Sequence, residues 1–161
     1  MKKSSHFDKD GKARMVDVSD KPVTKRTAVA RCSVFMKKET LDMIKEGMVS
    51  KGDVLGVARI AGIMAAKRVP EIIPLCHPLN ISSVNIEFEI DVKKNMITIE
   101  SCVKITGQTG VEMEALTSAA ASALTVYDMC KSVDKGMIIS DLMLIKKTGG
   151  KSGEFTRQKK F

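Results

Sequence analysis

The stretch 80–106, NISSVNIEFEIDVKKNMITIESCVKIT, decides the fold class. From Val84 to Ile90 every second residue is apolar, and Asn or Glu stands between them. This alternation predicts a strand at 80–91 with one buried face, and 96–106 has the character of a second strand. The polar run 93–95 between them predicts the turn of a β-hairpin. An antiparallel sheet is therefore the frame for the rest of the chain.

Working outward, the patterns before the hairpin predict a strand at 27–36, a short helix at 39–46 and a helix from 54 to about 68, which Asp53 caps. After it they predict a helix at about 111–132 and a strand at 137–145. The order βαββαβ predicts an α+β, ferredoxin-like fold, an antiparallel sheet with helices packed on one face. We expect one domain at 15–147, between a flexible N-terminal tail at 1–14 and a flexible Gly/Lys-rich C-terminal tail at 148–161.

Three features refine this prediction. The helix predicted at 54–68 is apolar nearly all round, which favours burial on more than one face. The small side chains of 115–124, ALTSAAASAL, let a second element approach closely. Pro74 and Pro78 predict that 72–78 is a loop, and Pro70 is expected beyond the end of the preceding helix.

Net charge is +8, from 27 Lys or Arg against 19 Asp or Glu. The excess lies at the two ends, because residues 2–14 carry +3 and residues 146–161 carry +5. Charged ends are usually solvated, so we expect no nucleic-acid partner. The four cysteines form no CxxC pair, and neither a secretory signal nor an apolar run of membrane-spanning length is present. We therefore expect reduced thiols, a cytoplasmic location and no membrane partner.

Cys76 and His77 lie between two prolines, whose fixed φ angles restrict this loop. An imidazole titrates near neutral pH and can donate, accept or shuttle a proton. The alternative is a loop histidine that bonds a backbone carbonyl, and position alone does not separate the two. No second His or Cys stands at ligand spacing, so we expect no metal site.

Acidic residues mark both ends of the helix predicted at 111–132. Glu112 and Glu114 complement the helix dipole in the simplest interpretation. They point about 200° apart, so if one faces water the other points inward and needs a cation or a ligand. Asp128 and Lys131 form a surface ion pair by default. The apolar residues around them favour a half-buried site instead, where an acid and a base tune each other's pKa.

The length of this helix has a consequence for any shared site. Glu114 and Asp128 lie about 21 Å apart along a straight helix and about 40° apart around it. One small ligand cannot easily touch both. A shared site therefore requires two antiparallel copies, which predicts a two-fold dimer with sites at its interface.

Several basic residues could bind the phosphates of a ligand. Lys51 precedes the predicted helix start, a place suited to anions. The other candidates are Lys67, Arg68, Lys131, Lys146 and Lys147. For any single lysine a solvated surface role is the alternative. The run GGKSG at 149–153 resembles a Walker A motif only superficially, because the full spacing and a following helix are missing.

Together these segments resemble the MoaC family, in order and spacing, from about Met15 to Phe155. They are MVDV at 15–18, KGD at 51–53, ARIAG at 58–62, AAKR at 65–68, IPLCHPL at 73–79, TGQTGVEMEALT at 106–117, YDMCK at 127–131 and GGKSG at 149–153. The LCHP and TGVEMEALT strings are far more specific than an isolated His or Glu.

The resemblance implies a lyase of molybdenum cofactor (molybdopterin) biosynthesis with a ferredoxin-like fold, assembled as a homohexamer of three dimers. Its substrate would be the GTP-derived (8S)-3′,8-cyclo-7,8-dihydroguanosine 5′-triphosphate, and its products cyclic pyranopterin monophosphate and pyrophosphate. The functional partner would be the upstream radical-SAM GTP cyclase. We expect no cofactor, and whether Mg²⁺ accompanies the triphosphate stays open.

The resemblance also assigns roles to residues. Asp128 would be the general acid/base, with Lys51 and Lys131 as further catalytic groups. The substrate-binding positions would be Leu75, Cys76, His77, Met113 and Glu114, supported by Glu112, Arg26, Lys67 and Lys147.

Two alternatives from other classes stay open, a ferredoxin-like RNA-binding module and a ligand-sensing domain without catalysis. RNA-binding modules of this fold stack bases on aromatic side chains of the sheet. Here the strands offer Phe35 and Phe88 and little else.

Overall fold

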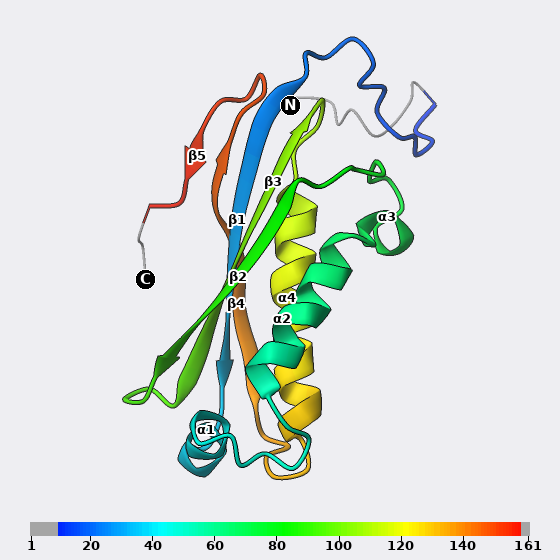
Figure 1. Cartoon of the computed structure of the whole chain (residues 1–161). Helices are drawn as coiled ribbons and strands as arrows, with labels where there is room; N and C mark the ends of the chain where they lie inside the picture. The colour runs from blue at the N-terminus through cyan, green and yellow to red at the C-terminus, as the bar shows by residue number, and fades with distance from the viewer. Residues whose placement is uncertain (1–9, 159–161) are drawn as a thin grey trace.

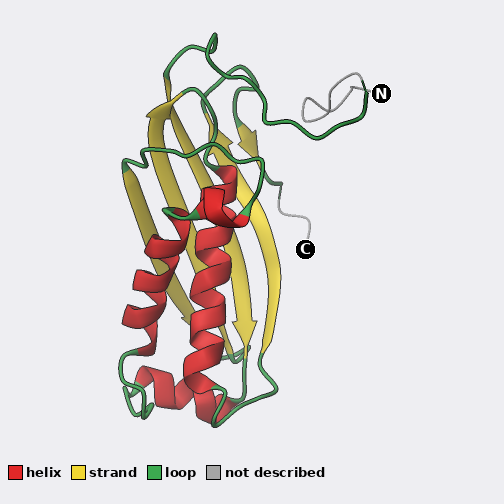
Figure 2. Cartoon of the chain, turned by 90° about the vertical axis from the view of Figure 1, so that its right-hand side faces the viewer, coloured by secondary structure: helices red, strands yellow, loops and turns green. Residues whose placement is uncertain are grey.

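The computed structural model describes residues 10–158, which form a five-stranded antiparallel sheet with helices packed on one face (Figures 1 and 2). The strands are β1 Thr24–Phe35, β2 Ser83–Asp91, β3 Met96–Gly107, β4 Ile138–Thr148 and β5 Phe155–Thr156. The helices are α1 Lys38–Lys45, α2 Val54–Ala66, α3 Val69–Ile72 and α4 Glu112–Cys130. Of the predicted tails, residues 1–9 and 159–161 lie outside the described residues. Over residues 10–158, no helix combines the length and the apolar character needed to cross a bilayer.

The strand order β2-β3-β1-β4-β5 confirms the predicted ferredoxin-like fold. β1 runs antiparallel to both β3 and β4, and β3 pairs with β2. The chain passes from β1 to β2 through α2 and from β3 to β4 through α4, over the same face (Figure 2). Candidate functional residues therefore gather where these helices begin and end.

Alternation along the strands builds the core, as predicted. On β1 four alternate residues from Ala28 to Val34 are at most 1% exposed, and on β3 alternate residues from Ile97 to Ile105 are buried. The predicted hairpin is confirmed, because Asp91 of β2 lies opposite Met96 of β3.

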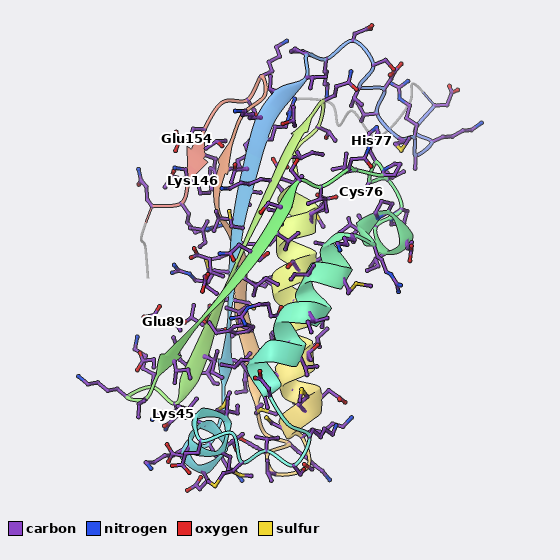
Figure 3. The ribbon with its side chains drawn as sticks, in the orientation of Figure 1. Lys45, Cys76, His77, Glu89, Lys146 and Glu154 are labelled. Atoms are coloured by element: carbon purple, nitrogen blue, oxygen red, sulfur yellow. The ribbon has the colours of Figure 1, made fainter. Side chains whose placement is uncertain are left out.

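Two segments are more regular than the sequence predicts. Pro70 lies beyond the end of α2, as predicted, but there it stands in the first turn of a further short helix, α3. Proline is tolerated there, because its missing N–H is one that a helix leaves unused. At the other end of the chain β4 continues to Thr148, and residues 155–156 of the predicted tail pair with β4 as β5. Lys146 of β4 forms an ion pair with Glu154 at 3.0 Å beside this edge (Figure 3).

Gly149 and Gly150 make the turn between β4 and β5 possible. Their φ angles are +90° and +75°, a region that glycine adopts at no steric cost. A Cβ at Gly149 would meet the Lys25 carbonyl oxygen, and one at Gly150 would meet the Arg26 guanidinium. The glycine pair therefore packs against β1, although its composition suggested only flexibility.

α2 and α4 approach closely through small side chains, as the stretch 115–124 predicts. The Ser122 hydroxyl donates a hydrogen bond of 3.0 Å to the Ala58 carbonyl. Gly62 of α2 also faces α4. A Cβ on Gly62 would lie 2.9 Å from the Ser118 carbonyl oxygen and closer still to Ser122 Oγ.

We expect Gly62→Ala to destabilise the fold by about 1–3 kcal/mol, because an overpacked contact forces the two helices apart. Urea unfolding followed by circular dichroism measures this change. Gly136→Ala is the matched control, because its Cβ would meet nothing closer than 3.4 Å. An unchanged free energy of unfolding in Gly62→Ala would contradict the close packing.

The outer face of α2 is open in the single chain. Val57, Ile60 and Met64 are 44%, 64% and 42% exposed. The buried residues of α2 form one stripe facing α4 and the sheet: Val54, Ala58, Gly62 and Ala66. Burial on more than one face is thus a wrong prediction for one chain, because no second layer among the described residues covers this helix.

Asp134, in the loop after α4, fixes the start of α1. Its carboxylate is 1% exposed and accepts the Lys37 N–H at 2.8 Å and the Gly136 N–H at 3.0 Å. Lys37 is the N-cap residue of α1 and makes no side-chain cap of its own, so Asp134 supplies the acceptor from 97 residues away. The Lys37 N–H is the chief cause that lowers the pKa of Asp134.

We expect Asp134→Ala to lower the free energy of unfolding by about 1–3 kcal/mol at neutral pH, because the Lys37 and Gly136 N–H groups lose their buried acceptor. The folded-state pKa lies below the unfolded one, so this stabilisation is complete above the unfolded value and is lost as pH falls through the folded value. Urea unfolding over a pH series checks both points, with the exposed Asp20→Ala as control. A difference that stays constant into strong acid would refute the assignment.

Candidate active site

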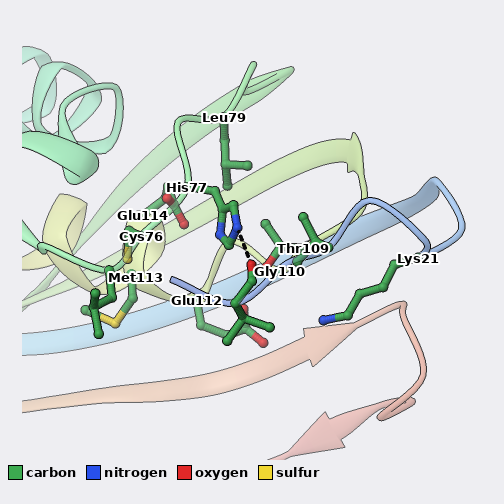
Figure 4. A pocket seen from close by; sticks show the side chains of 12 residues that line it. Lys21, Cys76, His77, Leu79, Thr109, Gly110, Glu112, Met113 and Glu114 are labelled. Carbon is green, nitrogen blue, oxygen red and sulfur yellow. Dashed lines mark hydrogen bonds between the residues drawn. The ribbon is translucent and has the colours of Figure 1, made fainter. Parts of the chain in front are cut away.

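A pocket of about 240 Å³ opens at the N-terminal end of α4 (Figure 4). The loops before β2 and before α4, the first turn of α4 and the segment 16–21 form its walls. Its lining residues are Val16, Val18, Lys21, Leu75, Cys76, His77, Leu79, Thr109, Gly110, Glu112, Met113 and Glu114. The structure thus brings together the predicted positions of the LCHP and VEME segments.

His77 points its ring toward the segment 16–21. Its Nε2 lies 2.8 Å from the Val16 carbonyl oxygen, shown as a dashed line in Figure 4. A carbonyl cannot donate a hydrogen bond, so Nε2 carries the proton in this contact. Nδ1 is then the ring nitrogen that remains to contact a ligand. The structure agrees with the interpretation of His77 as a loop histidine that bonds a carbonyl. It also places His77 in the pocket, where a catalytic or binding role is open to it.

Of the two acids in the first turn of α4, Glu114 is the inward one, 3% exposed. Burial raises the pKa of Glu114, and the negative charge of Glu112 adds to the rise. Burial also raises the pKa of the Cys76 thiol, and the Glu114 charge acts in the same direction. The floor of the pocket thus holds a carboxyl that keeps its proton more readily than a solvated glutamate.

Glu112 is half-buried and lies 3.7 Å from Lys147 Nζ on β4. Arg26 of β1 donates from Nε to the Gly107 carbonyl at 3.0 Å and from Nη2 to the Gln108 carbonyl at 2.8 Å. Arg26 and Lys147 therefore support the rim of the pocket without lining it. Arg26 lines an adjoining hollow instead, and Lys21 is common to both.

The second group of predicted residues lies at the other end of α4. Lys51 Nζ is 3.1 Å from Asp128 Oδ2 and 2.9 Å from the Asp128 carbonyl oxygen. Lys131 Nζ is 2.5 Å from Asp128 Oδ1. The antiparallel course of α2 and α4 puts Lys51, just before α2, beside the last turn of α4. One carboxylate thus lies between two ammonium groups.

These contacts shift the pKa values of Asp128 and Lys131. The Lys131 hydrogen bond, followed by that from Lys51, lowers the pKa of Asp128, and the bond to Asp128 raises the pKa of Lys131. The sequence suggested a half-buried pair, yet in one chain Asp128 is 56% and Lys131 52% exposed. The difference arises because the apolar neighbours Met129 and Cys130 turn inward while Asp128 and Lys131 point outward.

Within one chain the pocket residues do not meet the second group, which consists of Lys51, Asp128 and Lys131. The pocket with Cys76 and His77 lies near one end of α4 (Figure 3), and Asp128 lies in its last turn. The separation follows from the helix, about 21 Å for the fourteen residues between Glu114 and Asp128. Lys67 caps the C-terminal end of α2, at the pocket end, and is exposed outside the lining.

Other residues of the site have no clear signature in the sequence. Lys21 stands between Asp20 and Pro22 in an irregular segment, and nothing local indicates that it reaches the pocket. Leu79 and Thr109 lie within the quoted segments IPLCHPL and TGQTGVEMEALT and could have been inferred from them. In the described range 10–158, no group of three His, Cys, Asp or Glu side chains could hold a metal ion.

Residues 15–150 match the model of the MoaC family. Three curated relatives carry the name cyclic pyranopterin monophosphate synthase. The one from Desulfitobacterium hafniense is 58% identical, covering 96% of this chain and 94% of its own. Those from Heliobacterium modesticaldum and Bacillus thuringiensis are each 56% identical, covering 96% and 98% of this chain and 97% and 99% of their own.

Proposed function

Because the chain belongs to the MoaC family, we propose that it is a cyclic pyranopterin monophosphate synthase, an enzyme of molybdenum cofactor biosynthesis. The proposed substrate is (8S)-3′,8-cyclo-7,8-dihydroguanosine 5′-triphosphate, which a radical-SAM GTP cyclase would supply. The proposed products are cyclic pyranopterin monophosphate and pyrophosphate. The four free cysteines support a cytoplasmic location for these steps.

The observation that carries the catalytic proposal is the contact of Asp128 with both Lys51 and Lys131. The reaction opens the imidazole ring, rebuilds a pyrazine ring and forms a cyclic phosphate by expelling pyrophosphate. These steps need proton transfer and stabilisation of phosphate charge, which Asp and Lys supply without redox chemistry.

The pKa directions divide the roles. Asp128, with its lowered pKa, is ionised at neutral pH and serves first as the base. Lys131, with its raised pKa, holds its proton and serves as the acid or as a partner of phosphate. In the pocket, Glu114 and His77 offer a carboxyl and an imidazole to the polar edge of a guanine-derived ring, and Leu75 and Met113 offer apolar walls.

The proposed site needs two chains. One ligand cannot contact the pocket and Asp128 of the same α4, but an antiparallel copy would bring Asp128 of one chain to the pocket of the other. The open apolar face of α2, with Ile60 64% exposed, and Leu124 of α4, 61% exposed, supply surface for such a contact. The proposed assembly is a homohexamer of three such dimers.

The RNA-binding alternative is not favoured. Phe88 lies on the helix side of β2, packed against the core and under the Arg59 guanidinium at 5.2 Å from the ring centre. It therefore cannot serve as a stacking platform on the open face of the sheet. The curated relatives match this chain over nearly their whole length, and they carry the name of an enzyme.

Turnover of the cyclised nucleotide, followed by pyrophosphate release and by detection of the cyclic monophosphate product, tests the proposed function. We expect both products from the purified chain, in equal amounts. Binding of the nucleotide without product would instead support the ligand-sensing alternative.

A further inference from the structure

The segment 16–21, which we call the N-terminal arm, folds over the pocket through its own hydrogen bonds. Asp17 Oδ1 accepts the Ser19 N–H at 2.9 Å and the Ser19 hydroxyl at 2.7 Å. The Lys21 N–H donates to the Val18 carbonyl at 3.0 Å and closes a turn. The arm is therefore a compact unit that presents Val16, Val18 and Lys21 to the pocket.

Gln108 fastens this arm from the loop between β3 and α4. Its side-chain Nε2 donates to the Ser19 carbonyl at 2.9 Å and to the Lys21 carbonyl at 3.1 Å. An amide nitrogen carries two N–H groups, and both are used here. The main-chain carbonyl of Gln108 accepts from Arg26, so the side chain can be changed without removing that bond.

The arm in turn orients His77. The Val16 carbonyl, at the start of the arm, accepts from His77 Nε2 at 2.8 Å. The Asp17–Ser19 contacts link Val16 to the carbonyl that Gln108 holds. We therefore expect a displacement of the arm at Ser19 to change the position of the imidazole ring.

We propose that Gln108 is a positioning residue, which through the N-terminal arm holds His77 with Nε2 protonated and keeps the Lys21 ammonium at the pocket. This role rests on the proposed function only for its effect on turnover. The placement of the His77 proton is a property of the free protein.

Gln108→Glu tests the proposal, because it keeps the shape and turns both donors into an oxygen that faces two carbonyls. We expect the His77 ¹⁵N resonances to move from the Nε2–H pattern toward an average of both tautomers. Comparison with a His77→Gln variant identifies which of the two sets of imidazole resonances belongs to His77. We expect KM for the cyclised nucleotide to rise about tenfold, the effect of a lost hydrogen bond on binding, and kcat to change less than about threefold.

Three variants serve as comparison. Gln108→Met removes the donors without adding charge, and it should reproduce both changes if Gln108→Glu fails to fold. Gln108→Lys keeps N–H donors and should restore the Nε2–H pattern and a near-normal KM. Asn85→Asp makes the same amide-to-carboxylate change on β2, away from the pocket, and should alter neither.

Unchanged His77 resonances together with an unchanged KM in Gln108→Glu and Gln108→Met would overturn the proposal. A fall in kcat alone, in step with a lower melting temperature, would likewise assign Gln108 a merely structural role. If wild-type protein fails to turn over the nucleotide, the proposed function is lost, yet the ¹⁵N measurement still decides whether Gln108 positions His77.

Discussion

Asp128→Asn is expected to lower turnover by about 10²–10⁴-fold, the usual effect of removing an acid/base group. The amide keeps the size of the carboxylate, but it cannot take a proton and leaves Lys51 and Lys131 without their shared negative partner. Because the side chain is exposed in the single chain, the fold should survive the change. Steady-state release of pyrophosphate measures the loss.

Asp42→Asn is the matched control for this experiment. Asp42 also forms an exposed ion pair with a lysine, Lys38 at 2.6 Å, but on α1 and outside the proposed site. We expect normal turnover from it and unchanged circular dichroism from both variants. Near-normal turnover in Asp128→Asn would remove Asp128 from the catalytic role.

Mixing two inactive variants is expected to restore about a quarter of wild-type activity. If each site combines the pocket of one chain with Asp128 of its partner, then Glu114→Gln and Asp128→Asn are each inactive alone. A mixed dimer holds one site with both defects and one with neither. Random exchange makes about half of the dimers mixed, and half of the sites in those are intact.

The measurement is turnover after the two variants are unfolded together and refolded, compared with each variant treated alone. A mixture of Asp128→Asn with Lys131→Ala is the control, because both defects then fall on the same half of the site and no intact site arises. Light scattering of the wild type gives the assembly. A fully active monomer, or no recovery in the first mixture, would defeat the proposal of a shared site.

The strands were predictable because their period-2 alternation is strong and continuous, as in 80–106. The ends of elements were less predictable, because distant contacts decide them. Pro70 lies in the first turn of α3, although proline usually marks where a helix ends, and the turn at Gly149 and Gly150 packs against Lys25 and Arg26 of β1. The cap of α1 comes from Asp134, which no local motif could indicate.

The site shows the same division. The i,i+3 pair of Asp128 and Lys131 is local and follows from helix geometry. The contact of Lys51 with Asp128 joins residues 77 apart and depends on how α2 packs on α4, so only the family resemblance pointed to it. The N-terminal arm and its fastening by Gln108 depend on hydrogen bonds to main-chain carbonyls, which any residue supplies and no sequence motif reveals.

Because two groups of polar residues lie at opposite ends of α4, the length of this helix sets the distance between them. One inserted residue would lengthen it by about 1.5 Å and rotate everything beyond the insertion by about 100°. Each group could then remain intact in its own surroundings while the spacing between them no longer fitted a partner chain. Homologous chains should therefore accept length changes in the hairpin turn at 92–95 far more readily than between Glu114 and Asp128, even at solvent-facing positions.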